Sequence, residues 1–293
     1  MQILYPDNWQ DYELLDTGGG QKLERFGKFI LSRPEPDAIW QKTLPNTEWE
    51  KADAKFVKSD NASENGKWIT RKDFPQRWTI RYGNLSFYLK LTPFKHTGIF
   101  PEQAVHWDWM VDKIKNARRP LRILNLFGYT GAASLAAAQA GARVVHVDAS
   151  KPTVAWAREN QELSGLSNLP IRWIIDDVLK FISREIKREQ FYDCIIMDPP
   201  SFGHGPNRQV WKFSTSFPKL LALCKEVLSP NPLFIIVNAY AISSSFLILH
   251  NTLEQFFPNQ PGNIESGELA LKETSAGKLL STGIFSRWSN EQK

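Results

Sequence analysis

The stretch LRILNLFGYTG, residues 121–131, decides which fold this sequence predicts. An apolar run of strand length ends in a turn that contains two glycines, and the alanine-rich segment Thr130–Ala140 follows it directly. A buried strand, a tight turn and a helix in this order form the opening unit of a doubly wound α/β sheet. Ligands of such sheets bind beyond the carboxyl ends of the strands, so this turn is the first candidate binding site.

Predicted strands and helices alternate on the C-terminal side of this stretch. The strands are Leu121–Leu126, Arg143–Val147, Ile171–Ile175, Tyr192–Met197 and Leu233–Val237, and the helices are Thr130–Ala140, Pro152–Ser164, Val178–Glu189, Phe213–Leu228 and Ser244–Phe257. This alternation indicates a mainly parallel sheet with helices on both faces. The end of the chain differs, because Glu265–Thr274 and Lys278–Trp288 are predicted to form an antiparallel hairpin.

The first third of the chain has another character. Turn residues such as Gly18-Gly19-Gly20 interrupt it, and short segments such as Trp78–Tyr82 and Leu85–Leu91 alternate as strands do. We therefore expect two domains, a β-rich substrate-binding domain over residues 1–95 and a cofactor-binding domain over residues 96–293.

The composition is that of an ordinary globular protein, since 42% of the 293 residues are hydrophobic and 23% are charged. Neither a signal peptide nor a membrane-spanning stretch is expected. The two cysteines, Cys194 and Cys224, lie in apolar segments, so no disulfide framework is expected and the cytoplasm is the predicted compartment. The net charge of +5 is compatible with a nucleic-acid partner and also with an enzyme of small molecules.

Aromatic and basic residues are concentrated in the first half of the sequence. It holds most of the eleven tryptophans: Trp9, Trp40, Trp49, Trp68, Trp78, Trp107 and Trp109. Packing in the core is one explanation, and a platform on which nucleobases stack is the other. The stretch 67–82 mixes both residue types as single-strand surfaces do, with Lys67, Arg71, Lys72, Arg77 and Arg81 between Trp68, Phe74, Trp78 and Tyr82.

Two motifs of the predicted sheet indicate a nucleoside cofactor. Gly128 and Gly131 let the backbone approach a ligand closely, but Thr130 stands at the middle position of the G-x-G-x-x-G pattern that nicotinamide folds use. Asp148 ends the next strand, where a carboxylate can accept hydrogen bonds from both hydroxyls of a ribose. A helix N-cap ahead of Pro152 is the structural alternative for Asp148.

Two further motifs follow later strands. Asp176-Asp177 comes after the third strand, where one carboxylate can accept from the amino group of adenine while the other caps the next helix. Asp198-Pro199-Pro200-Ser201-Phe202 comes after the fourth strand, and its prolines fix the backbone beside the reacting group. Asp198 supplies an acceptor there, and Phe202 a ring that can stack on a planar substrate. The polar stretch 203–208 is suited to closing over that substrate.

Together these motifs resemble class I S-adenosylmethionine (SAM)-dependent methyltransferases, in particular the large-subunit ribosomal RNA methyltransferase group, over about residues 95–257. The likeness is carried by FGYTG at 127–131, VDASK at 147–151, AWAREN at 155–160, DDV at 176–178 and DPPSF at 198–202. It implies SAM as the cofactor and a doubly wound, mostly parallel seven-stranded sheet. Upstream, Phe94–Gln103 is similar to the family's segment in which a Lys-Thr-Gly, an aromatic residue and a glutamine close the SAM pocket.

The motifs and the resemblance give the candidate site residues. The predicted cofactor-binding residues are Lys95, Thr97, Phe100, Gln103, Asn125, Phe127, Gly128, Tyr129, Thr130, Gly131, Asp148, Ala149, Ser150, Asp176, Asp177 and Asp198. The predicted catalytic residues, which hold the methyl acceptor, are Asp198, Pro199, Pro200 and Phe202. No metal site is expected.

The sequence departs from the family in two places. Members that methylate carbon 5 of cytosine use a cysteine after the fifth strand, where this chain has Val237-Asn238-Ala239-Tyr240, and neither Cys194 nor Cys224 is placed to replace it. The RNA-binding PUA module of some relatives is not evident in residues 1–95. Without a nucleophilic thiol, a nitrogen lone pair of the acceptor is the favoured attacking group.

From the resemblance we expect a SAM-dependent methyltransferase that modifies a base of ribosomal or other RNA, with no membrane or metal partner. Two alternatives remain open. One is a small-molecule methyltransferase on the same fold, which the mild charge allows. The other is a non-catalytic SAM-binding module, against which the intact Asp198-Pro199-Pro200 argues. A nicotinamide-dependent reductase is a more distant alternative, and the sequence gives no oligomeric state.

Overall fold

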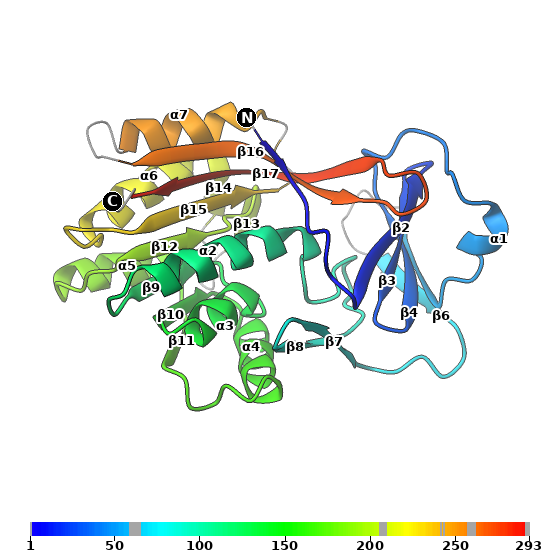
Figure 1. The fold of residues 1–293 in the computed structure, drawn as a ribbon, viewed down its shortest axis with the longest axis horizontal. Coiled ribbons are helices and arrows are strands. Elements are labelled where there is room, and N and C mark those ends of the chain that lie inside the picture. The colour runs from blue at the N-terminus through cyan, green and yellow to red at the C-terminus, as the bar shows by residue number, and fades with distance from the viewer. Residues whose placement is uncertain are drawn as a thin grey trace. The chain divides into compact units, whose positions relative to one another are not determined.

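The computed structural model describes residues 2–58, 66–204, 210–240, 242, 244–256 and 262–290 (Figure 1). By internal contacts the chain divides into two compact units. The α/β unit consists of Met1–Leu4, Val105–Leu269 and Thr282–Lys293, and the β-rich unit of Tyr5–Ala104 and Ala270–Ser281. The division therefore falls after Ala104 rather than at residue 95, and Ala270–Ser281 belongs with the N-terminal residues.

The α/β unit is built on one mixed sheet. In spatial order its strands are β1 (Gln2–Leu4), β16 (Asn263–Lys272), β17 (Leu279–Ser289), β15 (Phe234–Ala239), β12 (Cys194–Met197), β9 (Arg122–Leu126), β10 (Arg143–Asp148) and β11 (Ile171–Ile175). The five strands from β15 to β11 are parallel to one another, and β17 runs antiparallel to β15.

Over the described residues this sheet has eight strands, one more than the resemblance implied. The additional strand is β1, which pairs in parallel with β16. Strand β16 is ten residues long, and an uncovered edge of that length would present its backbone N–H and C=O groups to other chains. Pairing with β1 covers part of that edge.

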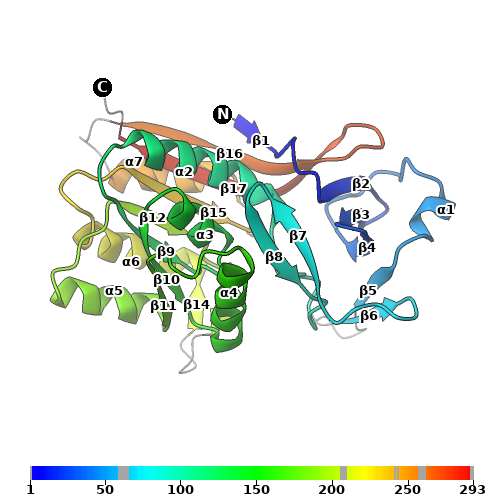
Figure 2. The same cartoon turned by 60° about the horizontal axis from the view of Figure 1, so that its bottom comes forward.

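Helices cover both faces of the sheet, as the alternation of strands and helices predicted (Figure 2). One face carries α2 (Ala104–Asn116), α3 (Ala132–Gln139) and α4 (Lys151–Leu163), and the other carries α5 (Val178–Lys187), α6 (Phe213–Glu226) and α7 (Leu247–Phe256). Because the central strands are buried on both faces, they appear in the sequence as continuous apolar runs rather than as alternating ones.

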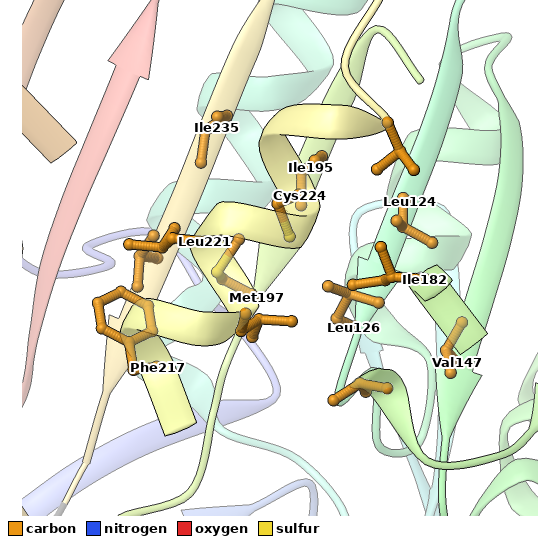
Figure 3. Close-up of a cluster of buried hydrophobic side chains, with 14 of the residues drawn as sticks. Leu124, Leu126, Val147, Ile182, Ile195, Met197, Phe217, Leu221, Cys224 and Ile235 are labelled. Atoms are coloured by element: carbon orange, nitrogen blue, oxygen red, sulfur yellow. The ribbon is translucent and has the colours of Figure 1, made fainter. Parts of the chain in front are cut away.

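Figure 3 shows the core between the sheet and helices α5 and α6. Leu124 and Leu126 of β9 point into it beside Ile195 and Met197 of β12, and Phe217 of α6 closes it. Fully burying one such side chain contributes about 1.5–3 kcal/mol to folding. The strand ends that carry the candidate site are therefore held by a densely packed, rigid layer.

The β-rich unit contains a five-stranded sheet and a separate two-stranded one. The larger sheet has the order β2 (Tyr12–Gly18), β3 (Gln21–Phe26), β4 (Phe29–Pro34), β5 (Ala54–Lys58) and β6 (Gly66–Thr70), the smaller pairs β7 (Trp78–Tyr82) with β8 (Leu85–Leu89), and α1 spans Asn46–Trp49. A buried ion pair joins Arg33 to Glu24 at 2.7 Å, and the Tyr12 hydroxyl donates to Glu24 at 2.9 Å.

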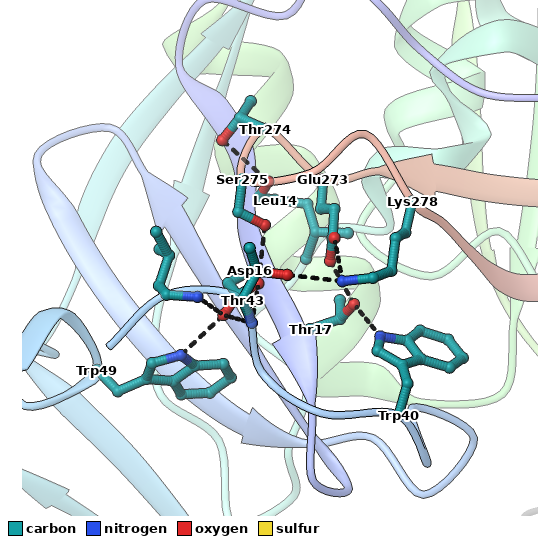
Figure 4. A network of polar contacts seen from close by, with 11 residues as sticks. Leu14, Asp16, Thr17, Trp40, Thr43, Trp49, Glu273, Thr274, Ser275 and Lys278 are labelled. Carbon is teal, nitrogen blue, oxygen red and sulfur yellow. Dashed lines mark hydrogen bonds and ion pairs between the residues drawn. The ribbon is translucent and has the colours of Figure 1, made fainter. Parts of the chain in front are cut away.

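Residues 273–278, which connect β16 to β17, are bonded to strand β2 within the β-rich unit (Figure 4). The backbone N–H of Thr274 donates to the Leu14 carbonyl at 2.9 Å, and the Ser275 hydroxyl donates to the Asp16 carboxylate at 2.7 Å. Asp16 also accepts from the Trp49 indole at 3.0 Å. Two segments far apart in the sequence thus complete one network.

Four tryptophans of the first half serve packing. Trp9, Trp49, Trp78 and Trp107 are buried. Trp78 packs edge-on against Phe29 and donates its indole N–H to the Phe26 carbonyl at 3.2 Å. The packing explanation is confirmed for these four residues, because a ring buried in the protein offers no face on which a nucleobase can stack.

Candidate functional site

The predicted site segments meet at one edge of the α/β sheet. The pairing registers align Met197 with Leu126, Leu126 with Val147, and Asp148 with Ile175. Four neighbouring parallel strands therefore end at the same level, which is where ligands of such sheets bind. The segments that follow these ends are Phe127–Gly131, Asp148–Ser150, Asp176-Asp177 and Asp198–Phe202.

The loop Phe127–Gly131, called the glycine loop below, has an unusual backbone. Phe127, Tyr129 and Gly131 have positive φ angles of 56°, 51° and 90°. A side chain larger than that of glycine adopts this region at a cost of about 1–2 kcal/mol, so surrounding contacts must hold Phe127 and Tyr129 there. The loop closes through a hydrogen bond of 3.0 Å from the Gly131 N–H to the Gly128 carbonyl.

Asp148 is fixed by backbone donors on both of its carboxylate oxygens. Oδ2 accepts from the N–H of Tyr129 at 3.0 Å, and Oδ1 accepts from the N–H of Ser150 at 2.9 Å. Burial raises the pKa of the Asp148 carboxyl, although these two bonds lower it. The N-cap of α4 is Ser150, whose side chain accepts from the Thr153 N–H, so the capping alternative for Asp148 is wrong.

This arrangement fits the ribose of the expected cofactor. Each carboxylate oxygen has two lone pairs, and each uses one of them for a backbone N–H. One lone pair per oxygen is left, which matches the two neighbouring hydroxyls of a ribose. The carboxylate of Asp148 is also half-buried at the end of β10, where a hydrogen bond to a charged group is stronger than in water.

The two aspartates after β11 have separate roles. Asp177 is the N-cap of α5, because its side chain accepts from the Lys180 N–H at 3.0 Å. Asp176 accepts from the Asp177 N–H at 2.8 Å and forms an ion pair with Arg184. The capping explanation is thus confirmed for Asp177, and the predicted contact with adenine is left to Asp176.

Three other predicted cofactor residues lie in the glycine loop or close to it in the site segments. Asn125 is buried, and its side-chain amide donates to Ser134. Thr130 is buried, and its carbonyl accepts from the Asn160 amide at 3.0 Å. Ala149 is exposed. Asn160 was missed by the sequence analysis, although it lies in the AWAREN stretch that carries the resemblance.

The segment Asp198–Phe202, called the proline segment below, is anchored by Trp211. The indole N–H of Trp211 donates to the Pro200 carbonyl at 2.6 Å, and its ring packs edge-on against Phe127 at 5.1 Å. Trp211 therefore belongs to the candidate site, and the sequence analysis missed it. Its only sequence signal is a large aromatic residue shortly after the prolines.

A short two-stranded arm follows the prolines. Strand β13 (Phe202–His204) pairs with β14 (Val210–Lys212) in a register that places Phe202 opposite Lys212. Phe202 is 55% exposed and Val210 is 53% exposed, whereas Trp211 between them is buried. Residues 205–208 of the predicted closing stretch lie outside the described residues.

Lys95, Thr97, Phe100 and Gln103 belong to the β-rich unit. Burial lowers the pKa of Lys95, and its backbone carbonyl accepts from Arg33 at 3.0 Å. The Thr97 hydroxyl is buried without a hydrogen-bond partner among the described residues. Their contact with the cofactor stays a prediction.

Neither cysteine has the properties of a nucleophile. Cys194 in β12 and Cys224 in α6 are both fully buried. Burial raises the pKa of both thiols, so neither forms a thiolate near neutral pH.

The described part of the chain lacks the features of two other classes of site. It contains no cluster of three or more histidine, cysteine, aspartate or glutamate side chains able to hold a metal ion. None of its helices is long and apolar enough to cross a membrane.

Known proteins match this chain in sequence and structure. A family model described as S-adenosylmethionine-dependent methyltransferase matches residues 54–258. The solved structure of a SAM-dependent methyltransferase from Agrobacterium tumefaciens is 42% identical, with a TM-score of 0.95, over 99% of this chain and 94% of that chain. The structure of SMU.776 complexed with SAH has a TM-score of 0.73 at 21% identity over 96% of this chain and 76% of that chain, which shows the same fold.

Curated relatives include proteins named ribosomal RNA large subunit methyltransferase K/L. Those of Shewanella frigidimarina and Pseudoalteromonas translucida are 36% and 32% identical over 155 and 154 residues. Each match covers 52% of this chain and 21% of the relative. The chain therefore matches about a fifth of the length of these relatives.

Proposed function

Because the chain belongs to the family of SAM-dependent methyltransferases, it transfers methyl groups from SAM, and we propose that the acceptor is a nitrogen atom of an RNA base. The observation that carries this proposal is the 55% exposure of Phe202, at the end of the proline segment. RNA-modifying proteins stack unpaired bases on aromatic side chains of this kind. The name of the curated relatives makes ribosomal RNA the first candidate.

SAM, when bound, supplies an electrophilic methyl group, and the protein contributes mainly by alignment. Asp148 would accept hydrogen bonds from the ribose hydroxyls with the one lone pair on each carboxylate oxygen that no backbone N–H uses. Asp176 and the backbone of the glycine loop would hold the rest of the cofactor. From the resemblance, Lys95, Thr97, Phe100 and Gln103 would close the pocket.

The proline segment would hold the acceptor base. Trp211 already engages the Pro200 carbonyl, so we assign the hydrogen bonds to the base to the Asp198 carboxylate and the Pro199 carbonyl. Both groups accept hydrogen bonds and can therefore orient an N–H-bearing base. A nitrogen whose lone pair faces the methyl group can attack directly, which agrees with two buried thiols of raised pKa.

The arm β13–β14 would extend the contact to the neighbouring nucleotide. Phe202 and Lys212 are opposite one another, and both are exposed. Stacking of a base on an aromatic ring contributes about 1–3 kcal/mol, and a lysine beside it can meet the phosphate. Trp211, the neighbour of Lys212 on β14, is buried, so Lys212 lies on the opposite face of the arm.

The β-rich unit would bind the rest of the RNA, as expected for residues 1–95. Lys67, Lys72 and Arg81 are exposed. Two other residues of the basic stretch have partners, since Arg71 lies 3.6 Å from Asp53 and Arg77 stacks over Tyr88. Lys67, Lys72 and Arg81 are therefore the better candidates for phosphate contacts.

The test is methylation with tritiated SAM of total RNA, protein and small-molecule extracts from cells that lack the enzyme. Label in RNA, mapped to a ring or exocyclic nitrogen, is the expected result. A small-molecule acceptor, which the mild net charge of +5 also allows, would place the label in the small-molecule fraction and overturn the proposal. A variant with both Cys194→Ala and Cys224→Ala should methylate at an unchanged rate if it folds.

A further inference from the structure

A histidine lies directly beneath the glycine loop. His146 is in β10 with 0% of its surface exposed. A Cβ atom added to Gly128 would lie 2.5 Å from His146 Nδ1, a distance that real Cβ atoms essentially never show. The imidazole and the loop backbone are thus in van der Waals contact, and only glycine at position 128 leaves room for the ring.

Hydrogen bonds fix the orientation of this ring. The Asn125 amide donates to the Ser134 hydroxyl oxygen at 2.9 Å, and Ser134 lies 2.9 Å from His146 Nδ1. The Ser134 oxygen accepts from Asn125 and also contacts Nδ1, so Ser134 links the Asn125 amide to the ring. Burial lowers the pKa of His146 to about 3, so the ring is neutral near pH 7.

Other side chains support the remainder of the loop in the same way. A Cβ atom on Gly131 would lie 3.0 Å from the Cβ of Ala157 and 3.3 Å from the Trp173 indole. Trp173 in turn lies 4.6 Å from the His146 ring and donates to Gln161 at 3.0 Å. The loop therefore rests on a packed layer of which His146 is the centre.

We infer that His146 is a positioning residue for SAM. Its ring determines how closely Gly128 approaches strand β10, and it thereby positions the N–H of Tyr129, which donates to Asp148. Few contacts separate His146 from the expected ribose site. The ring contacts Gly128, the next residue donates to Asp148 Oδ2 at 3.0 Å, and Asp148 is the expected ribose acceptor. A loop that shifts by a few tenths of an ångström would turn the carboxylate away from the ribose hydroxyls.

The inference is tested by calorimetric binding of S-adenosylhomocysteine, the inert product, so that the acceptor need not be known. His146→Leu keeps a side chain of similar size and removes both ring nitrogens. We expect its affinity to fall by about tenfold or more, as when one hydrogen bond to a charged group is misaligned. With an acceptor in hand, the KM for SAM should rise while kcat at saturating SAM is retained.

The matched control is Val144→Ala. Val144 is buried on the same strand and the same face as His146, two residues towards the amino end and away from the loop. It should lower the melting temperature and leave the affinity for S-adenosylhomocysteine unchanged. If His146→Leu and Val144→Ala weaken binding equally, or if His146→Leu binds as tightly as the wild type, His146 has no positioning role.

A second test does not depend on the folding of His146→Leu. Gly128→Ala should weaken binding by pushing against the ring, and it should weaken it much less in a His146→Ala background, where the new methyl group has room. Ser134→Ala, which removes only a hydroxyl, should give a smaller loss. Additive effects of Gly128→Ala and His146→Ala would overturn the inference.

Discussion

Trp211 joins the glycine loop to the proline segment, since its indole N–H donates to the Pro200 carbonyl at 2.6 Å while its ring packs against Phe127 at 5.1 Å. The loop proposed to bind the cofactor and the segment proposed to hold the acceptor are thus linked by one side chain. Alignment of the two reactants is the main source of catalysis in methyl transfer, so a shift of either side should appear in turnover.

We therefore expect Trp211→Phe to lower kcat by about fivefold, because the ring contact survives and the hydrogen bond, worth about 1 kcal/mol, does not. Affinity for S-adenosylhomocysteine should change little, since Asp148 and its donors are not touched. Single-turnover kinetics at saturating SAM measure the effect. A variant that turns over like the wild type would show that the indole N–H has no part in alignment.

Phe202→Ala and Lys212→Gln should separate stacking from phosphate contact. Phe202→Ala should lower affinity by about 1–3 kcal/mol at every salt concentration, because stacking carries no counterion release. Lys212→Gln should instead reduce the slope of log affinity against log salt by about one unit. The measurement is binding of the RNA found by labelling, at several salt concentrations.

Lys219→Gln is the matched control for Lys212→Gln. Lys219 is also exposed, but it lies on α6 away from the arm. It should leave both affinity and slope unchanged. Equal slopes for the two variants would count against Lys212 as a phosphate contact.

Asp148→Ala should remove most of the stabilisation of the protein by SAM. At 100 times its dissociation constant a ligand raises the free energy of unfolding by about 2.7 kcal/mol, and a lost hydrogen bond to a charged group costs about 1.5–3 kcal/mol. Thermal unfolding of wild type and variant, with and without SAM, measures this. NAD serves as the control ligand, and stabilisation of the wild type by NAD rather than by SAM would contradict the cofactor.

The β-rich unit should lose stability in acid. Burial alone would raise the pKa of Glu24, but Arg33 beside it lowers that pKa from 4.5 to about 2. Because the folded state has the lower pKa, the stabilisation is complete above about pH 4.5 and is lost as the pH falls towards 2. Urea unfolding followed by tryptophan fluorescence across this interval should show the loss.

Glu24→Gln should be unstable at every pH, because an unpaired buried Arg33 costs about 3–5 kcal/mol. Glu48→Gln is the control, since the ion pair of Glu48 with Lys51 is exposed and contributes little. A wild-type stability that stays flat from pH 4.5 to 2 would mean that Glu24 is not charged in the folded protein.

The sequence predicted those parts of the site that depend on local pattern. Apolar runs placed the parallel strands, and the residues just after them, such as Asp148 and Asp198, were placed at one edge because parallel strands end together. Local pattern left two explanations open for Asp148, and the structure excludes the helix N-cap, because Ser150 has that role.

What the sequence did not predict depends on long-range contacts. Trp211 has no periodic signal that links it to Pro200, and β1 pairs with a strand some 260 residues later. Nothing local distinguishes Arg71, which has an ion-pair partner in Asp53, from Lys72, which is exposed. Such pairings are set by the tertiary fold and are visible only in it.

The bond between Ser275 and Asp16 has a consequence for synthesis on the ribosome. Strand β2 is an edge strand of its sheet, and its backbone partners at Glu273–Ser275 are translated about 260 residues later. At about 5–20 residues per second the nascent chain would carry that uncovered edge for roughly 13–52 s. An uncovered edge strand can pair with strands of other chains, so we expect this protein to depend on chaperones during translation.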